Sequence, residues 1–270
     1  MSPKIWAALV LFVLGLAAAG YAVYSWQTGR TRPPAAQAPA TPPAAAAPAA
    51  EAPAPVQNPV PGAAPEAQMQ APAETPADLA RAFDESLASL ADRGQIEQFV
   101  ATDELVRRIV ASVDSMTTDT VVMRVRAVKA IPGQFATQGR DGEIVLDPAN
   151  FARYGPFVRF VESIDTKRAT ALYVKFYSLF QGEYRAQGYP KRYFNDRLIV
   201  AIDDLLAAPE IREPIRLVQP KVLYRYADPD LEARSAGQKA MIRMGPDNAQ
   251  RLKAKLRALR GELARQPTRP

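Results

Sequence analysis

Residues 166–184, TKRATALYVKFYSLFQGEY, decide the fold, because their apolar side chains return at helical spacing. Seven apolar positions fall three or four residues apart, so they share one face of a helix of about five turns. Asp165 precedes the stretch as an N-cap, and Gly182 and Gly188 predict that the helix ends shortly after residue 184. Burial of this face, at about 25 cal/mol per Å² of apolar surface, would contribute several kcal/mol. We predict a central core helix whose buried face is Ala169, Leu172, Tyr173, Phe176, Leu179, Phe180 and Tyr184.

The composition excludes several classes of chemistry. The chain has 270 residues, a formal net charge of +6, no Cys and no His. Ser-His-Asp triads, Cys nucleophiles, zinc fingers and haem attachment are therefore excluded, and any catalysis would use carboxylates, Lys, Tyr or Ser. The absence of Cys is also compatible with an oxidising compartment.

Residues 1–29 are predicted to form an N-terminal transmembrane anchor. Residues 5–26 carry no charge and are long enough, at about 1.5 Å per residue, to cross a hydrocarbon layer of about 30 Å. Trp6 and Trp26 bracket this run, as expected for membrane-interface residues at the two ends of a helix through the lipid bilayer. The alternative is a signal peptide that is cleaved after residues 17–19, which are all Ala.

Residues 30–76 are predicted to be a disordered Pro/Ala-rich linker. From residue 33 to 76 they contain no aromatic and no basic residue, so they offer too little apolar surface to fold, and their prolines favour an extended polyproline II chain. Such a spacer suits a bacterial inner-membrane protein, single-pass, with its C-terminal domain in the periplasm. Lys4 and the terminal amine balance Arg30 and Arg32, so the positive-inside rule leaves a cytoplasmic domain open.

Residues 77–265 are predicted to form one helical domain with one minor β-hairpin, followed by a disordered tail at 266–270. Thr102 is expected to cap the helix that begins near residue 105. Residues 135–138 and 143–146 flank a turn-rich tetrapeptide and predict the hairpin. Residues 215–226, interrupted by Pro220, predict either two short extended pieces or a helical turn. Further helices are expected over residues 79–90, 105–116, 148–161, 194–205, 228–244 and 246–263.

The domain resembles the DUF3014 family of bacterial proteins. The resemblance extends from about residue 77 to about residue 263, and it implies a membrane-spanning N-terminus followed by a Pro/Ala-rich linker. It implies no catalytic residue, no metal ligand and no cofactor. The residues that carry it are Asp147-Pro148-Ala149-Asn150, Arg153-Tyr154, Tyr189-Pro190, Phe194-Asn195-Asp196-Arg197-Leu198, Ile202-Asp203, Leu205-Leu206, Tyr226-Ala227-Asp228-Pro229, Ser235-Ala236-Gly237-Gln238-Lys239, Arg243-Met244-Gly245-Pro246 and Asn248.

Three acidic residues are candidates for carboxylate chemistry. Asp196, Asp203 and Asp204 could be interpreted as the paired acids of a glycosidase. However, adjacent helical residues point about 100° apart, so Asp203 and Asp204 are not expected to face one site. Surface exposure or ion pairs with Arg197 is the preferred interpretation.

Two further patterns fall short of known sites. Asp228, Asp230 and Glu232 have the alternate spacing of a calcium loop but lack its glycine and its final glutamate, so helix capping explains them better. Ser235 and Lys239 are four residues apart rather than the three of the Ser-x-x-Lys acyl-transfer motif.

The residues from 226 to 243 also suggest a contact site for a ligand or partner. Tyr226, Asp228, Gln238, Lys239 and Arg243 place long polar groups near each other, which could bind a small anion or a peptide. The alternative is a hydrogen-bond network that joins neighbouring helices.

The last helix combines a leucine seam with basic residues. The seam at residues 249–263 could pack inside the domain or form a dimer contact. The basic residues could bind anionic lipid, a cell-wall polymer or nucleic acid, or form a solvated outer face. They are Arg251, Lys253, Lys255, Arg257, Arg260, Arg265 and Arg269.

The sequence therefore predicts a single-pass inner-membrane protein that presents a helical binding or scaffolding domain in the periplasm. Its partner would be an envelope protein or an anionic polymer, and nucleic acid is disfavoured. The alternatives are an envelope hydrolase that uses carboxylates and a cytoplasm-facing domain that binds an anionic partner.

Overall fold

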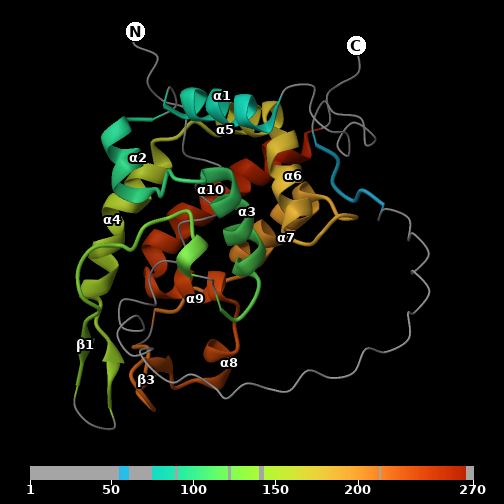
Figure 1. Ribbon diagram of the computed structural model, residues 1–270. Helices are drawn as coiled ribbons and strands as arrows, with labels where there is room; N and C mark the ends of the chain where they lie inside the picture. Colours follow the sequence, from blue (N-terminus) through green and yellow to red (C-terminus); the bar gives the residue numbers. More distant parts are fainter. Residues whose placement is uncertain are drawn as a thin grey trace, which may run out of the picture.

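The domain is mainly helical with two small antiparallel hairpins, as seen in the computed structural model, which describes residues 55–60, 75–88, 91–120, 123–139, 143–212 and 214–265 (Figure 1). The mainly helical prediction is confirmed, and the single predicted hairpin is corrected to two. The helices are α1 (Pro76–Ala88), α2 (Arg93–Phe99), α3 (Leu105–Met116), the 3-10 helix η4 (Met123–Val125), α4 (Ala149–Glu162), α5 (Thr166–Lys175), α6 (Tyr177–Ala186), α7 (Phe194–Leu206), α8 (Pro229–Glu232), α9 (Ala236–Arg243) and α10 (Pro246–Ala264). The strands are β1 (Thr137–Gln138), β2 (Val145–Leu146), β3 (Leu217–Val218) and β4 (Arg225–Tyr226).

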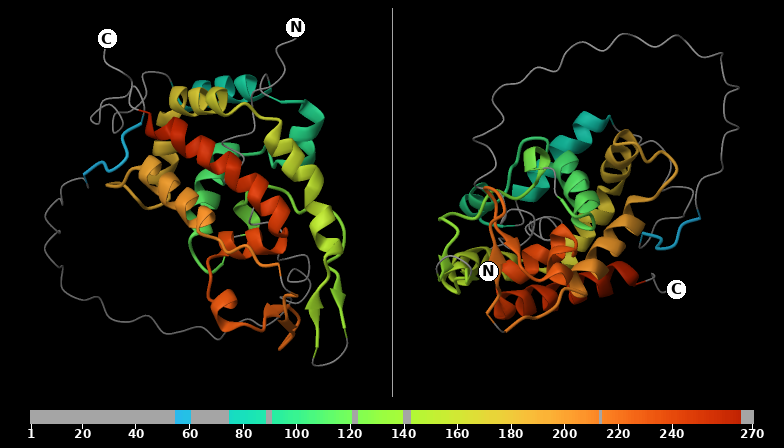
Figure 2. Two further views of the ribbon diagram at one scale, coloured as in Figure 1. Left: turned by 180° about the vertical axis from the view of Figure 1, so that it is seen from behind. Right: turned by 90° about the horizontal axis from the view of Figure 1, so that it is seen from below.

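Helix α10 crosses the back of the domain and packs against α4, α5 and α7 (Figure 2). Its apolar seam lies inside the domain, because every seam position is buried. The interpretation as an intramolecular contact is therefore confirmed. The seam residues are Ala249, Leu252, Leu256, Leu259 and Leu263.

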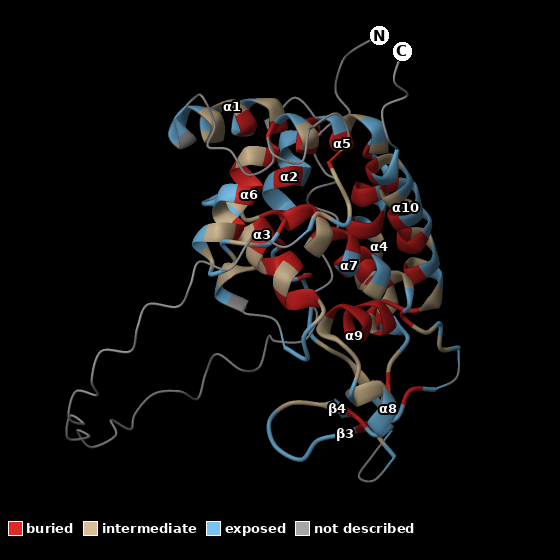
Figure 3. Cartoon of the chain, turned by 90° about the vertical axis from the view of Figure 1, so that its right-hand side faces the viewer, coloured by how far each residue is buried: buried red, intermediate tan, exposed pale blue. Residues whose placement is uncertain are grey.

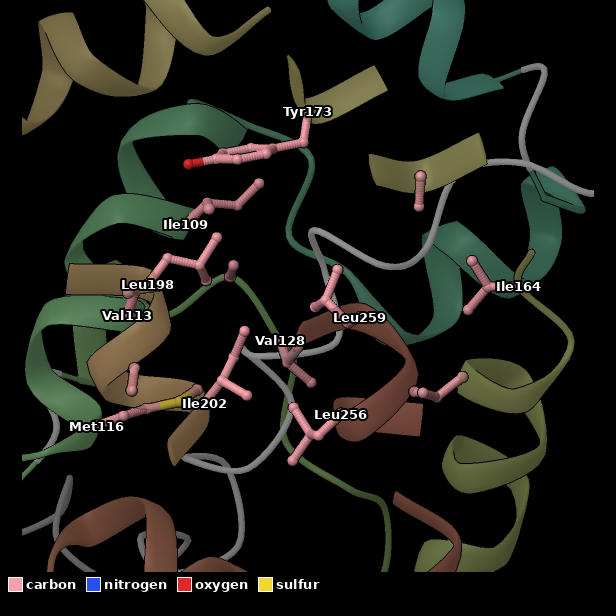
Figure 4. Close-up of a cluster of buried hydrophobic side chains, with 14 of the residues drawn as sticks. Ile109, Val113, Met116, Val128, Ile164, Tyr173, Leu198, Ile202, Leu256 and Leu259 are labelled. Atoms are coloured by element: carbon pink, nitrogen blue, oxygen red, sulfur yellow. The ribbon is translucent and has the colours of Figure 1, made fainter. Parts of the chain in front are cut away.

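On the other side of the core, α3 packs against α6, α7 and α9. Figure 4 shows that α3 and α10 contribute to one hydrophobic cluster, with Ile109 and Val113 from α3 and Leu256 and Leu259 from α10. Each of these four side chains is buried. This continuous apolar cluster explains why the helices form a single packed unit.

The predicted core helix over residues 166–184 is broken into α5 and α6. Phe176 separates the two helices with φ −105° and ψ 18°, outside the regular helical range. The predicted face is nevertheless correct, since all seven of its apolar residues are buried. The Phe176 ring packs edge to face against Phe83 of α1, with 5.5 Å between ring centres. The break between α5 and α6 therefore lies where Phe176 contacts α1.

The two hairpins form a small ledge at the end of the domain away from α1 (Figure 1), where Figure 3 shows β3 and β4. In β1–β2, Thr137 pairs with Leu146, and in β3–β4, Leu217 pairs with Tyr226. Backbone bonds between residues 144 and 217 and between residues 146 and 215 join the hairpins. Two extended pieces over residues 215–226, one of the two predicted alternatives, are thus confirmed.

Two other local predictions are wrong. The helix that begins at Leu105 is preceded by Glu104 in a left-handed conformation, and no cap from Thr102 is formed. The helix predicted over 228–244 is two helices, because Ser235 caps α9 by accepting the Gln238 N–H at 3.1 Å. A second N-cap inside a predicted helix ends one helix and starts another.

The predicted anchor, including Trp6 and Trp26, and the tail at 266–270 lie outside the residues that the structure describes. Among the residues it does describe, no helix has the length and apolar character needed to span a membrane. Residues 55–60 lie within the predicted linker, and there the structure departs from the prediction, because this segment is placed against the domain and Val60 is buried.

Candidate functional site

A groove with a volume of about 770 Å³ lies between α4, the hairpin ledge and the turn that leads into α10. This volume is in the range of ligand-binding sites in proteins. One wall is a stripe of α4 at helical spacing, and another part of the lining consists of Ile211, Arg212, Pro214 and Ile215. Its principal apolar lining residues are Val145, Phe151, Ala152, Ile211, Pro214, Ile215, Met244 and Pro246.

The base of the groove is a close contact between the turn before α10 and α4. Gly245 has φ 86°, and a Cβ on this residue would lie 2.5 Å from Cγ of Phe151. Only glycine permits this backbone and this distance. The Asn248 side-chain amide then donates to the carbonyls of Phe151 and Met244, both at 2.9 Å. The corner predicted at residues 244–246 therefore holds α4 and α10 together.

The hairpin wall is fixed to α4 by the Asn150 side chain. Its oxygen accepts the Ala136 N–H at 3.0 Å, and its amide donates to the Ala136 carbonyl at 2.7 Å. Arg153 donates to the carbonyls of Pro132 and Gly133 just before the hairpin. Because Asn150 is buried and its polar atoms are satisfied, this wall is a built part of the fold.

Two guanidinium groups give the groove a positive rim. Arg159 and Arg212 both line it and are exposed. Asp247, the acidic residue among the lining side chains, lies 3.8 Å from Arg212, and both side chains are largely exposed. An exposed pair of this kind is worth less than about 1 kcal/mol, so a ligand carboxylate could replace it. The groove therefore suits an apolar segment that carries a carboxylate.

Three of the five residues predicted as a contact site come together behind this groove. The Tyr226 hydroxyl donates to the Lys239 carbonyl at 3.1 Å, and the Arg243 guanidinium lies 5.6 Å from the centre of the Tyr226 ring. Lys239 Nζ donates to the Glu232 carbonyl at 3.0 Å. Burial raises the pKa of Tyr226 to about 12, so its hydroxyl stays protonated near neutral pH.

The other two predicted residues lie apart from this group. Gln238 faces α7, where its amide donates to the Asp204 carbonyl at 3.0 Å and to the Asp204 carboxylate at 2.9 Å. Asp228 caps α8 by accepting the Asp230 N–H at 2.8 Å. The five side chains thus connect β4, α7, α8 and α9, and their role in contacting a partner stays a prediction.

The three candidate acids point to three different partners. Asp203 pairs with Arg260 of α10, and not with Arg197 as expected, while Asp204 accepts the Ser235 hydroxyl at 2.6 Å. Asp196 accepts backbone N–H groups of residues 57 and 58. The carboxylates do not converge on one reacting bond. The spacing of Ser235 and Lys239 also has a structural explanation, because Ser235 is the N-cap of α9.

Most of the basic residues on α10 are engaged within the domain. Arg251 forms a bidentate pair with Glu162, and Lys255 donates to the Ile164 carbonyl. Lys253 is buried, and its Nζ donates to the Ala208 carbonyl at 2.5 Å. Arg257 is exposed, and Arg269 lies outside the described residues.

In the part of the chain that the structure covers, no group of three or more acidic residues could hold a metal ion.

Sequence reasoning missed the groove residues because they come from three separate segments. Phe151, Arg159 and Arg212 carry no motif that would join them. The available signal was the small face of the helix at Ala152 and Gly155, together with the glycine–proline corner at residues 245–246.

Fold and groove together define a helical domain with a groove that is bordered by a hairpin ledge. Residues 105–260, more than half of the chain, match the family described as "Protein of unknown function (DUF3014)", and the chain belongs to this family. No curated protein and no solved structure matches the chain.

Proposed function

We propose that this chain is a single-pass inner-membrane protein that presents a helical binding domain in the periplasm, and that the groove binds an extended apolar segment of an envelope protein through a carboxylate on that segment. The observation that carries the proposal is the groove itself. It has a volume of about 770 Å³ and a lining that is more apolar than polar, and Arg159 and Arg212 stand at its rim.

The location rests on the N-terminal sequence. The uncharged run at residues 5–26 and the Pro/Ala-rich stretch after it are typical of an anchor and a spacer that hold a domain away from a bilayer. A groove between a helix and a hairpin ledge, on a rigid support, suits the capture of a chain segment by such a tethered domain.

An anionic polymer is a less favourable partner than a peptide for this groove. The apolar walls would gain little from a polymer that is charged along its length, whereas a peptide can supply both apolar side chains and one carboxylate. The basic residues of α10 do not form a free cationic face, because Arg251, Lys253 and Arg260 bind acidic residues of the same domain.

The location can be tested by labelling with a membrane-impermeant maleimide. The natural chain has no Cys, so a single Val218→Cys substitution at an exposed position of β3 provides one thiol. We expect labelling in intact cells whose outer membrane is permeable to the reagent. Val200→Cys on exposed α7 is the matched control and should be labelled to the same extent. Labelling of both positions only after disruption of the inner membrane would place the domain in the cytoplasm and overturn the proposal.

A further inference from the structure

Residues 57–60, which bend at Gln57 and Asn58, lie against the N-terminal end of α7 (Figure 1). The Asp196 carboxylate accepts the N–H of Asn58 at 2.5 Å and the N–H of Gln57 at 3.2 Å. It also accepts the Asn58 side-chain amide at 3.0 Å. The Asn195 side-chain amide donates to the Asn58 carbonyl at 2.8 Å. One short segment is therefore held through its backbone donors and one backbone acceptor.

The apolar end of the segment is enclosed by the domain. Val60 is 2% exposed and belongs to the main hydrophobic core. Pro59, directly before it, has no N–H and needs no hydrogen-bond partner. Burial of one valine side chain stabilises an arrangement by about 1.5–3 kcal/mol, so Val60 anchors the segment.

A buried hydrogen-bond network positions the Asn195 side-chain amide, which donates to the bound segment. Asn195 is completely buried, and its side-chain oxygen accepts the Tyr173 hydroxyl at 3.0 Å. Behind it, the Tyr177 hydroxyl donates to Gln181 at 2.8 Å, and the Gln181 oxygen also accepts the Phe194 N–H at 2.9 Å. Burial raises the pKa values of Tyr173 and Tyr177, so both remain hydrogen-bond donors.

The Asn195 oxygen is occupied by Tyr173, and its side-chain amide donates to the carbonyl of Asn58 in the bound segment. A buried amide without a partner would cost about 1–3 kcal/mol, so the fold favours a state in which a peptide carbonyl is present. The network was missed from the sequence, although Asn195 and Asp196 lie in the stretch that resembles the family.

We propose that Asn195, Asp196 and the buried surroundings of Val60, here called the α7 site, form a recognition site for an Asn-Pro-aliphatic peptide segment, and that the chain's own residues 57–60 occupy it as a tethered ligand. The α7 site shares no residue with the lining of the groove. The inference is therefore independent of the proposed function and of the side of the membrane on which the domain lies.

The covalent connection to the domain makes the bound segment hard for a free peptide to displace. Residues 61–75 connect the bound segment to α1, and a link of this length gives an effective concentration on the order of millimolar. A free peptide of the same sequence would compete poorly with the attached copy.

The test uses the full chain and a fluorescent peptide of residues 54–62, APVQNPVPG. Val60→Asp in the chain should empty the α7 site, because a carboxylate is too costly to bury in the apolar core. We expect the peptide to bind this variant at least tenfold more tightly than the natural chain, by fluorescence anisotropy. Val218→Asp, at an exposed valine, is the matched control and should bind as poorly as the natural chain.

A second substitution links binding to the site. Asp196→Asn in the Val60→Asp chain keeps the size of the side chain but removes the charge that accepts two backbone donors, and it should weaken peptide binding at least tenfold. Circular dichroism of each variant checks that the helices are retained. Equal binding to the natural and Val60→Asp chains, or no binding to either, would overturn the proposal. Concentration-dependent dimerisation of the natural chain that Val60→Asp abolishes would show that a second copy supplies the segment, and would overturn occupation by the same chain.

Discussion

Gly245 and Phe151 are in such close contact that a Cβ on Gly245 would lie 2.5 Å from Cγ of the phenylalanine ring. The same glycine has φ 86° and ψ 158°, a conformation that side-chain-bearing residues rarely adopt. The contact joins the turn before α10 to α4 and forms the base of the groove. Both the stability of the domain and the shape of the groove therefore depend on this pair.

Gly245→Ala should lower the free energy of unfolding by about 2–4 kcal/mol, because it adds both backbone strain and a steric clash. Urea unfolding followed by circular dichroism measures the loss. Gly261→Ala is the matched control on the same helix, where a Cβ would meet nothing within 4 Å. That substitution should stabilise the domain by about 0.5 kcal/mol through helix propensity. Equal stability of the two variants would contradict the packing described for Gly245.

Asp204 and Asp203 are adjacent in α7 but should differ in their contribution to stability. Asp204→Ala leaves the Ser235 hydroxyl without its acceptor, removes one of the two acceptors of the Gln238 amide and should cost about 1–3 kcal/mol. Asp203→Ala removes only a half-exposed pair with Arg260 and should cost less than about 1 kcal/mol. Urea midpoints of the two variants provide the comparison. A larger effect at Asp203 would show that the network between α7 and α9 is misassigned.

Lys253 should stabilise the domain although it is a charged residue in a buried position. Its Nζ satisfies the Ala208 carbonyl and lies 3.2 Å from Glu210. Lys253→Met keeps most of the apolar stem but leaves that carbonyl without a donor, which should cost about 1–3 kcal/mol. Arg257→Met, on the exposed face of the same helix, should change stability by less than about 0.5 kcal/mol. Thermal unfolding of both variants tests this difference, and similar melting temperatures would refute it.

The pair between Glu162 and Arg251 predicts a dependence of stability on pH. The hydrogen bond from Arg251 holds the pKa of Glu162 below its ordinary value of 4.5. A carboxylate whose pKa is lower in the folded state contributes stability above pH 4.5, and this contribution is lost as the pH falls through the folded pKa. Glu162→Gln should therefore be less stable than the natural chain at pH 7, and the difference should disappear in acid. Urea midpoints across this range provide the measurement. A difference that is constant with pH would exclude the ionic contribution.

The helical faces could be predicted from the sequence because burial imposes a period. The seam from Ala249 to Leu263 and the seven residues of the face at 166–184 are all buried as expected. The break at Phe176 could not be predicted from the sequence, because the apolar spacing continues through it without a glycine or proline. The helix boundary at Ser235 was missed for a related reason, since a serine inside a polar run gives no change of period.

The sites were less predictable than the faces, because they depend on contacts between distant segments. Val60 is one of two valines in a Pro-rich run, and nothing in its local sequence indicates that it is buried. Asn195 lies at the start of a helix, and only the fold brings it to the carbonyl of Asn58. The groove likewise forms only when α4, the lining residues between α7 and β3 and the corner at Gly245 lie side by side, which brings Arg159 and Arg212 to one rim.

The central claim, that the groove binds an envelope protein, is tested most directly by photocrosslinking in living cells. A benzophenone amino acid replaces Ala152, an exposed residue of the groove wall, and in a matched control it replaces exposed Val200 on α7. The account predicts one discrete protein adduct from position 152. That adduct should be absent from position 200 and should be lost when Arg159→Glu and Arg212→Glu reverse the charge of the rim. No adduct from position 152, or an adduct that persists after charge reversal, would contradict it.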